Sequence, residues 1–245
     1  MKGHRSAFPI KAVLLAAVSC VMLAALLYLA YLFKGLSLFR IKYVIGRPDS
    51  QVDLSYLKGS NIFELDLKKE SKRLAASYPG YKNIKLVRVF PDRIFADFKE
   101  RRPIAYLKLY RYFCVDDELV LFDMPKELSG PGLPIILGLE RKIYSPSPGT
   151  RLSIKELALA AEIIETAGKT EALKDYPIKT IQVPSLNNAS FVISGGLEIK
   201  ISQEDVPEKL SMLGSLLNQE RDGLGKIHYI DLRFKEPVIK LKDAD

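Results

Sequence analysis

The chain of 245 residues is poor in side chains that bind metals or carry out redox chemistry: it has no tryptophan, two histidines and two cysteines. His4 and His228 lie near opposite ends of the sequence, and no cluster of His, Cys, Asp or Glu has the spacing of a metal site. Cys20 lies inside a long apolar stretch and Cys114 far outside it, so a disulfide between them is geometrically implausible. We therefore expect no metal, no cofactor and no disulfide.

Motifs of nucleophilic and acid–base catalysis are also scarce. The G-x-S-x-G motif does not occur, and Cys114 has no partner motif, so it is interpreted as a buried or half-buried structural thiol. The run Asp116-Asp117-Glu118 is more typical of a solvated turn than of paired catalytic carboxylates. Arg101 and Arg102 follow an apolar strand, where such residues more often form a solvated or domain-facing edge than an anion site. This inventory predicts a protein that is not an enzyme.

No part of the sequence concentrates charge of one sign, although the net charge is +8. Lys2, Arg5 and Lys11 account for three of these charges, and the region after the apolar stretch interleaves basic and acidic residues. A mildly basic surface of this kind suits an anionic environment such as a membrane face. It lacks the dense Lys/Arg stripe of a nucleic-acid groove, so no nucleic-acid partner is expected.

One long apolar run is present, from Ala12 to Phe33, and it contains no charged residue. At ~1.5 Å per residue it extends about 33 Å as a helix, enough for a hydrocarbon core. A cleavable signal peptide has a shorter apolar region and ends in small residues, whereas this run ends in aromatic residues that resemble an interfacial belt. The prediction is a single transmembrane helix over 12–33, with a cytoplasmic tail over 1–11 and the main domain outside the cytoplasm.

The next part, over 38–104, is predicted to be a small α/β unit. A strand is expected from Leu38 to Ile45, followed by a helix with Leu74 on its apolar face and Pro79-Gly80 as its stop signal. Two further strands, Ile84–Phe90 and Arg93–Glu100, complete the order strand, helix, strand, strand. One helical layer over a short sheet is the natural packing of these elements.

The remainder, over 105–245, is predicted to be a mixed sheet domain with two helices, so that the fold class is α+β. Capping-box patterns at Ser153/Glu156 and Asp205/Glu208 predict the two helix starts. Gly195-Gly196 predicts a two-residue hairpin turn, because both glycines accept the positive φ that such a turn requires. Strands are expected around these elements, and the last two run from Lys226 to Phe234 and from Pro237 to Leu241.

Several of these segments resemble the FtsQ/DivIB family of bacterial cell-division proteins. The stretches Arg88–Arg93 and Glu100–Ala105 resemble the end of that family's POTRA domain. Leu133–Gly138 resembles its LPxxxG loop, and Tyr229–Phe234 resembles its C-terminal strand. The short basic tail, the single anchor and the strand-helix-strand-strand unit occur in the same order, so the resemblance covers essentially the whole chain.

The resemblance implies a non-enzymatic scaffold of the division machinery. Its partners would be the coiled-coil membrane proteins FtsB (or DivIC) and FtsL, and it would help to regulate septal peptidoglycan synthesis. The location implied is the cell (inner) membrane at the division septum. Other division proteins would dock on the POTRA unit, for which the sequence singles out no residues. The alternative is another POTRA-containing, membrane-anchored assembly or secretion component; those carry repeated POTRA units or a β-barrel, and neither pattern is found.

The predicted partner-binding residues lie in the last two strands. By resemblance, Phe234 and the strand after it correspond to the FtsB-binding region. The full predicted set is Arg233, Phe234, Val238, Ile239, Lys240 and Leu241. A terminal strand at a sheet edge tolerates Pro237 and offers unpaired backbone groups to a partner strand. A second interpretation stays open, in which Phe234 is part of the core and the terminal strand merely closes the sheet.

Overall fold

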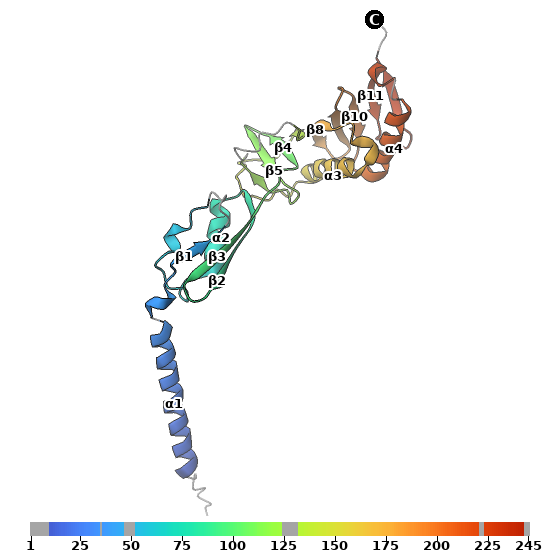
Figure 1. Cartoon of the computed structure of the whole chain (residues 1–245). Coiled ribbons are helices and arrows are strands. Elements are labelled where there is room, and N and C mark those ends of the chain that lie inside the picture. Colours follow the sequence, from blue (N-terminus) through green and yellow to red (C-terminus); the bar gives the residue numbers. More distant parts are fainter. Residues whose placement is uncertain (1–9, 35, 47–51, 124–131, 221–222, 243–245) are drawn as a thin grey trace, which may run out of the picture. The chain divides into compact units, whose positions relative to one another are not determined.

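The computed structural model describes residues 10–34, 36–46, 52–123, 132–220 and 223–242. It divides into two compact units: unit 1 comprises Met1–Leu74 and Asn83–Phe98, and unit 2 comprises Ala75–Lys82 and Lys99–Asp245. The chain passes between the units three times, within α2 (Leu67–Ser77), β2 (Tyr81–Val89) and β3 (Arg93–Glu100), which are labelled in Figure 1. The predicted cytoplasmic tail lies largely outside the described residues, and each unit is described by itself below.

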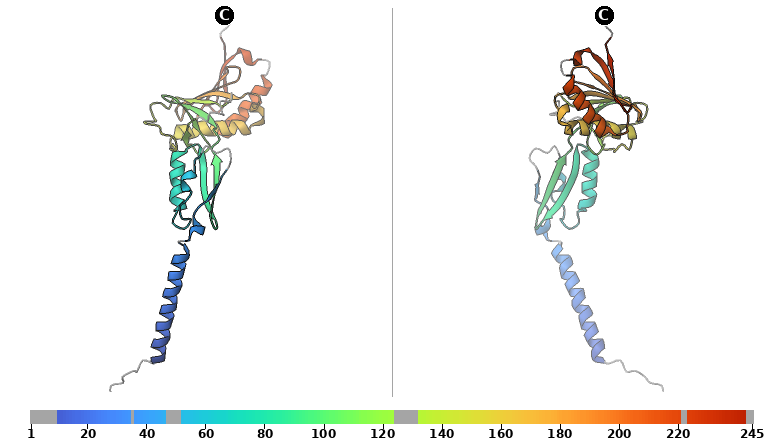
Figure 2. Two further views of the ribbon diagram at one scale, coloured as in Figure 1. Left: turned by 60° about the vertical axis from the view of Figure 1, so that its left-hand side comes forward. Right: turned by 90° about the vertical axis from the view of Figure 1, so that its right-hand side faces the viewer.

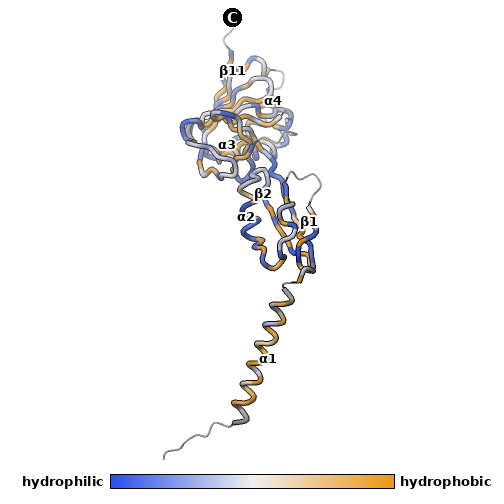
Figure 3. The backbone as a smooth tube through the Cα atoms, turned by 90° about the vertical axis from the view of Figure 1, so that its left-hand side faces the viewer, coloured by the Kyte–Doolittle hydropathy of each residue, from blue (hydrophilic) through white to orange (hydrophobic). Residues whose placement is uncertain are grey.

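Unit 1 begins with α1 (Ile10–Lys34), which coincides with the predicted apolar span. Apolar residues follow one another along most of this helix (Figure 3), and the described apolar side chains from Val13 to Leu32 are exposed. Among the described residues, no helix reaches the combination of length and hydropathy that crossing a membrane demands.

The rest of unit 1 is a three-stranded sheet with one α-helix, as the sequence predicts. The strand order is β1-β3-β2, with β1 (Tyr43–Ile45) parallel to β3, and the helix is α2 (Leu67–Ser77). Two 3-10 turns, η1 (Ser37–Phe39) and η2 (Ser55–Leu57), complete the unit. The strand expected from Leu38 to Ile45 begins only at Tyr43, because the first of these residues belong to η1, where Phe39 is buried.

The sheet of unit 1 buries alternate residues on one face. Ile94, Ala96 and Phe98 of β3 are buried, which confirms the predicted half-buried strand. In β2, Leu86 is buried and Val87 is exposed, so this strand also alternates despite two adjacent apolar residues.

Unit 2 contains a nine-stranded mixed sheet in the order β12-β11-β10-β9-β8-β7-β4-β5-β6. Its strands are β4 (Ala105–Lys108), β5 (Tyr112–Val115), β6 (Leu121–Phe122), β7 (Ile135–Leu137), β8 (Ile178–Ser185), β9 (Asn188–Ile193), β10 (Glu198–Ile201), β11 (Ile227–Asp231) and β12 (Val238–Leu241). The pairs β4–β7, β7–β8 and β10–β11 are parallel, and the other pairs are antiparallel.

Two helices and the sheet of unit 2 share one core. The helices are α3 (Lys155–Lys169) and α4 (Val206–Gln219), with 3-10 turns η3 (Glu171–Leu173) and η4 (Leu224–Lys226) (Figure 2). Leu157 and Ile163 of α3 and Leu210 and Leu213 of α4 are buried in the same cluster as the sheet side chains. The mixed α+β class and the two helices of this part are thus as expected.

Both predicted capping boxes are wrong, although both helices start within two residues of the predicted caps. The residue at the start of α3 is Ile154 rather than Ser153, and no side chain caps the helix. Glu156 instead accepts a hydrogen bond of 2.6 Å from Lys142 Nζ. Asp205 precedes α4 in a left-handed conformation, with φ of 52°, and its side chain makes no capping bond. At the start of α3, a contact with the distant Lys142 thus takes the place of the expected capping bond.

The hairpin predicted at Gly195-Gly196 is present between β9 and β10. These strands are antiparallel, and the two glycines have φ of 95° and 83°. A residue with a Cβ is strained at such angles, so the two glycines explain why the chain reverses here.

Cys114 in β5 has no exposed surface, which confirms its interpretation as a buried thiol. Burial, and secondarily the negative charge of Asp123, raises the pKa of this thiol to about 11. In a Cys20→Ser background, we expect Cys114 to react with a disulfide reagent at pH 8 at least ~100-fold more slowly than a free cysteine, because both access and thiolate are suppressed. Denaturant is expected to release one fast-reacting thiol, and Cys114→Ser is the control. Rapid labelling of the folded chain would contradict this assignment.

Candidate functional site

The strand β12 forms one end of the nine-stranded sheet and is paired on one side only. Its neighbour is the antiparallel strand β11, with Ile239 opposite Ile230 and Val238 opposite Asp231. No strand within the described residues pairs with its other side. The opposite end of the sheet is covered, because Leu121 of β6 exchanges backbone hydrogen bonds with Gly149 and Thr150. Among the described residues, the two ends of this sheet thus differ, and of the two only β12 leaves a row of backbone groups without a neighbouring strand.

The direction of the backbone groups follows from one hydrogen bond beyond the strand. The N–H of Lys242 donates to the carbonyl of Lys226 on the β11 side, at 2.8 Å. Since backbone groups alternate along a strand, the N–H groups of Lys240 and Val238 also face β11. Those of Ile239 and Leu241 then face away from the sheet. These two residues present the free donors of the edge.

Apolar side chains are exposed on both faces of β12. The exposed fractions are 48% for Val238, 38% for Ile239 and 60% for Leu241. Ile239 is opposite Ile230, which is buried, so it extends the apolar face of the core beyond the edge of the sheet. An edge strand that ends in solvent is normally covered or charged, and β12 carries one charged residue, Lys240, among its exposed apolar side chains.

Before β12, Arg233 and Asp231 form a clasp at the end of β11. The Asp231 side chain is nearly buried and accepts hydrogen bonds from Arg233 Nε at 2.9 Å and Arg233 Nη2 at 2.6 Å. The backbone N–H of Arg233 also donates to Asp231, and its Nη1 donates to Asn188 Oδ1 at 3.1 Å. The guanidinium thus fixes the chain between β11 and β12 while remaining partly exposed.

The clasp makes acid stability depend on Arg233. Hydrogen bonds from Arg233 hold the pKa of Asp231 below its ordinary value. The contribution of this carboxylate is therefore fully present above about pH 4 and is lost as the pH falls through the lower folded pKa. Arg233→Met leaves the nearly buried Asp231 without its guanidinium donors and with only the backbone N–H of residue 233, and we expect the acid-unfolding midpoint to rise by about half a pH unit or more. Circular dichroism measures it; Arg233→Lys is the intermediate control, and an unchanged midpoint would contradict the assignment.

The predicted partner-binding residues divide into two groups. Val238, Ile239, Lys240 and Leu241 lie together on β12, where Lys240 Nζ is 6.0 Å from the centre of the Tyr229 ring. Phe234 lies in the connection between β11 and β12 and is 60% exposed. It is not a core residue, so the interpretation that placed it in the core is wrong. The strand expected to run to Phe234 ends at Asp231, because the clasp turns the chain there.

Sequence reasoning missed Asp231, Asn188 and Lys200 as parts of this site. Lys200 Nζ is 3.8 Å from the centre of the Tyr229 ring, closer than Lys240. The spacing Asp231-x-Arg233 is a local signal for a turn closed by an ion pair, but Asn188 and Lys200 reach the site only through the pairing of distant strands.

A second clasp in unit 2 overturns the interpretation of Asp116 as part of a solvated turn. Its side chain is almost fully buried and is hydrogen-bonded to Arg101 Nη1. It also accepts hydrogen bonds from the backbone N–H groups of Glu118 and Val120, at 3.1 and 2.9 Å. Glu118 is 3.3 Å from Arg101 and 3.1 Å from Lys82, whose hydrogen bond lowers the pKa of Glu118. The two Asp-Arg clasps use the same carboxylate-to-guanidinium chemistry.

The described residues offer little for catalysis. No group of three metal-ligating side chains occurs among them, and every buried polar side-chain atom among them has a hydrogen-bond partner. A hollow of about 290 Å³ beside the end of α3 is lined mainly by apolar side chains, such as Ile164 and Leu173. The sequence contains one S-x-x-K tetrad, Ser55–Lys58 at η2, in which Ser55 and Lys58 are exposed and Leu57 is buried.

Comparisons with known proteins found relatives for this chain but no matching family model. A relative from Syntrophotalea carbinolica is 25% identical over 204 residues, 82% of this chain and 70% of that protein. One from Myxococcus fulvus is 23% identical over 76% of the chain and 64% of that protein, and one from Anaeromyxobacter sp. is 28% identical over 70% of the chain and 58% of that protein.

All three relatives are named cell division protein FtsQ. The matched part spans between 58% and 70% of their own length. The relatives come from different organisms and carry the same name, which is that of the family that the sequence motifs resemble. These relatives support the assignment of the chain to the FtsQ family of cell-division proteins.

Proposed function

We propose that this protein is a non-enzymatic scaffold of the division machinery that binds an FtsB- or DivIC-like partner through the free edge of β12. The observation that carries the proposal is the unpaired side of this strand, which combines free backbone donors at Ile239 and Leu241 with exposed apolar side chains. FtsL-like proteins and regulation of septal peptidoglycan synthesis belong to the same proposal. They follow from the family rather than from any feature of the described residues.

The physical basis of the proposed binding is strand addition. A partner segment that pairs with β12 gains main-chain hydrogen bonds along the strand, and these supply affinity without a preformed pocket. Side chains on alternate positions supply specificity, since Ile239 and Leu241 face the core side and Val238 and Lys240 face the other. Phe234 lies on the connection just before β12, where its exposed ring is available to contact the same partner.

The proposal places the protein in the cell membrane as a single-pass protein, with α1 as the anchor. The stretch of α1 whose side chains are described without a gap, residues 13–29, is about 26 Å long at ~1.5 Å per residue. This is slightly less than a hydrocarbon core of ~30 Å. The uncharged run from Ala12 to Phe33 reaches about 33 Å and supports a complete crossing. The short tail would lie in the cytoplasm, and the part of the chain after α1 would lie outside it, at the septum.

The family's POTRA domain is proposed over 38–104, which takes in most of unit 1 after α1 together with residues 75–82 and 99–104 of unit 2, and the β domain is proposed over 105–245. The order β1, α2, β2, β3 supports this assignment, since it matches the strand-helix-strand-strand order that the resemblance implies. Docking of further division proteins on this domain is part of the proposal, but no residue of the domain is assigned to it.

The test is a binding measurement with the whole chain in lipid nanodiscs. The probe is the extramembrane segment of the FtsB or DivIC homologue of the same organism, titrated by calorimetry. Micromolar or tighter binding is expected, and it should be weakened by Phe234→Ala. Absence of binding by a chain with native circular dichroism would contradict the proposal.

A further inference from the structure

One end of the unit 1 sheet exposes large apolar side chains that the proposed partner site does not use. Leu36 is 47% exposed, Leu38 50% and Phe90 57%. Leu36 and Leu38 belong to the segment just after α1, and Phe90 to the turn between β2 and β3. Exposed leucines and phenylalanines grouped in this way mark a surface that contacts something other than water.

Backbone bonds and ring contacts bring the two segments together. The N–H groups of Lys42 and Tyr43 donate to the carbonyl of Asp92, at 2.9 and 3.3 Å. The ring of Phe63 is centred 5.0 Å from that of Phe39 and 5.4 Å from that of Phe90. The segment over 36–43 and the turn over 90–92 therefore form one surface, here called the tip of unit 1.

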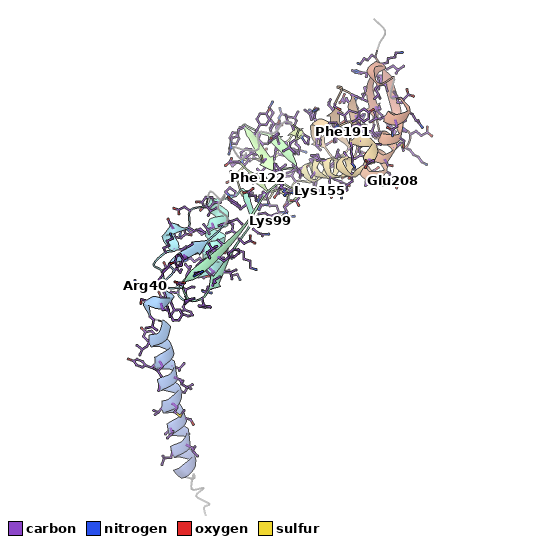
Figure 4. The ribbon with its side chains drawn as sticks, viewed as in Figure 1. Arg40, Lys99, Phe122, Lys155, Phe191 and Glu208 are labelled. Carbon is purple, nitrogen blue, oxygen red and sulfur yellow. The ribbon has the colours of Figure 1, made fainter. Side chains whose placement is uncertain are left out.

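Basic side chains surround the apolar residues of the tip. Arg40 is exposed, and Figure 4 labels it at this end of the unit. The side chains of Lys42 and Arg93 are about half exposed, and both lie 3.6 Å from the carboxylate of Asp92. These three basic groups outnumber the one nearly buried carboxylate beside them, so the tip keeps a positive charge.

The sequence limits how far the tip is from α1. Leu36 follows Lys34, the last residue of α1, by two positions, so the two Cα atoms are at most ~7 Å apart. Phe39 is five positions beyond Lys34, at most ~18 Å away. Continuity of the chain therefore keeps the tip close to the end of the proposed anchor.

We propose that the tip lies in the headgroup region of an anionic bilayer. Leu36, Leu38 and Phe90 would insert at the boundary of the acyl chains, while Arg40, Lys42 and Arg93 contact lipid phosphates. Apolar side chains ringed by basic ones are what an interface with anionic headgroups selects. The inference rests on the proposed membrane anchor and goes beyond it, because an anchor alone requires no contact between the lipid and the part of unit 1 that follows α1.

The absence of tryptophan makes a direct test possible. Phe90→Trp introduces a single indole at the tip of the full chain, reconstituted in vesicles of phosphatidylglycerol and phosphatidylcholine with bromine near the headgroup end of the acyl chains. We expect a blue-shifted emission and quenching of about half or more. Leu38→Trp is a second probe in case the ring contact with Phe63 does not tolerate indole. Tyr144→Trp, at a site in unit 2 that is 84% exposed, is the matched control and should remain unquenched.

The charge is tested in the same system. Arg40→Glu combined with Phe90→Trp should reduce quenching in anionic vesicles, and vesicles without phosphatidylglycerol should do the same. If the chain floats with the vesicles and the indole is quenched in neither the Leu38→Trp nor the Phe90→Trp variant, the inference is wrong and the anchor stands. If the chain fails to float, the anchor and the inference both fail. Quenching that equals that of the Tyr144→Trp control would also overturn the inference.

Discussion

Ile239→Pro is expected to weaken binding of the FtsB- or DivIC-like segment about 10- to 100-fold, because it removes a backbone donor that would pair with the partner strand. The N–H of Lys242 bonds to Lys226 of the neighbouring chain segment, and backbone groups alternate in direction along a strand, so the N–H of Ile239 points to the free side of β12. Proline is tolerated at an edge strand when its missing N–H faces outward, so β12 should remain paired with β11. Calorimetry with the whole chain measures the loss.

Ile239→Ala is the matched control for the side chain. It keeps the backbone donor and removes apolar surface, so a smaller loss of affinity than in Ile239→Pro is expected. Equal losses in the two variants would show that the side chain carries the interaction. Unchanged affinity in the proline variant, with native circular dichroism, would contradict strand addition at this edge.

Arg101→Met is expected to lower the free energy of unfolding of unit 2 by about 3–5 kcal/mol, since it leaves the buried carboxylate of Asp116 without its cation. Asp116 is almost fully buried, and its remaining partners are the backbone N–H groups of Glu118 and Val120. Adding Asp116→Asn to Arg101→Met should recover about 1–2 kcal/mol, because the amide oxygen still accepts those bonds and the buried charge is gone.

The thiol of Cys114 serves as the probe of this unfolding. It lies two residues before Asp116, has no exposed surface and becomes reactive only when unit 2 opens, so labelling along a denaturant series in a Cys20→Ser background gives the free energy. Glu165→Gln is the control, since Glu165 and Lys169 form an exposed i,i+4 pair at 2.6 Å that contributes less than ~0.5 kcal/mol. A loss of less than ~1 kcal/mol in Arg101→Met would contradict a stabilising role for the clasp.

The two Asp-Arg clasps close the turns that follow β5 and β11. In each, an aspartate near the end of a strand accepts a hydrogen bond from the backbone N–H two residues later and pairs with an arginine. Asp116 pairs with Arg101, which is distant in sequence, whereas Asp231 pairs with its near neighbour Arg233. The first clasp joins segments of unit 2, and the second shapes the approach to the proposed binding edge.

Patterns within the sequence were sufficient for the elements whose formation depends on local spacing. The apolar run coincides with α1, the alternation in Arg93–Glu100 with β3, and Gly195-Gly196 with the hairpin between β9 and β10. Period and turn chemistry are properties of adjacent residues, so they can be recognised before any tertiary contact is known. The position of the terminal strand was also predictable, since Val238–Leu241 follows directly on Pro237.

Only the tertiary structure decided which charged and apolar side chains are buried. A run of three acidic residues is usually solvated. Asp116 is nevertheless buried, because Arg101 and two backbone N–H groups donate the hydrogen bonds that water would otherwise supply. Phe234 continues the alternation of Ile230 and Leu232 but is exposed, because the Asp231–Arg233 clasp ends β11 before it. The free side of β12 depends on the order of nine strands, most of them distant in sequence, so no local pattern specifies it. Local spacing thus determined the elements of this protein, and long-range pairing decided which strand lies at the proposed binding edge.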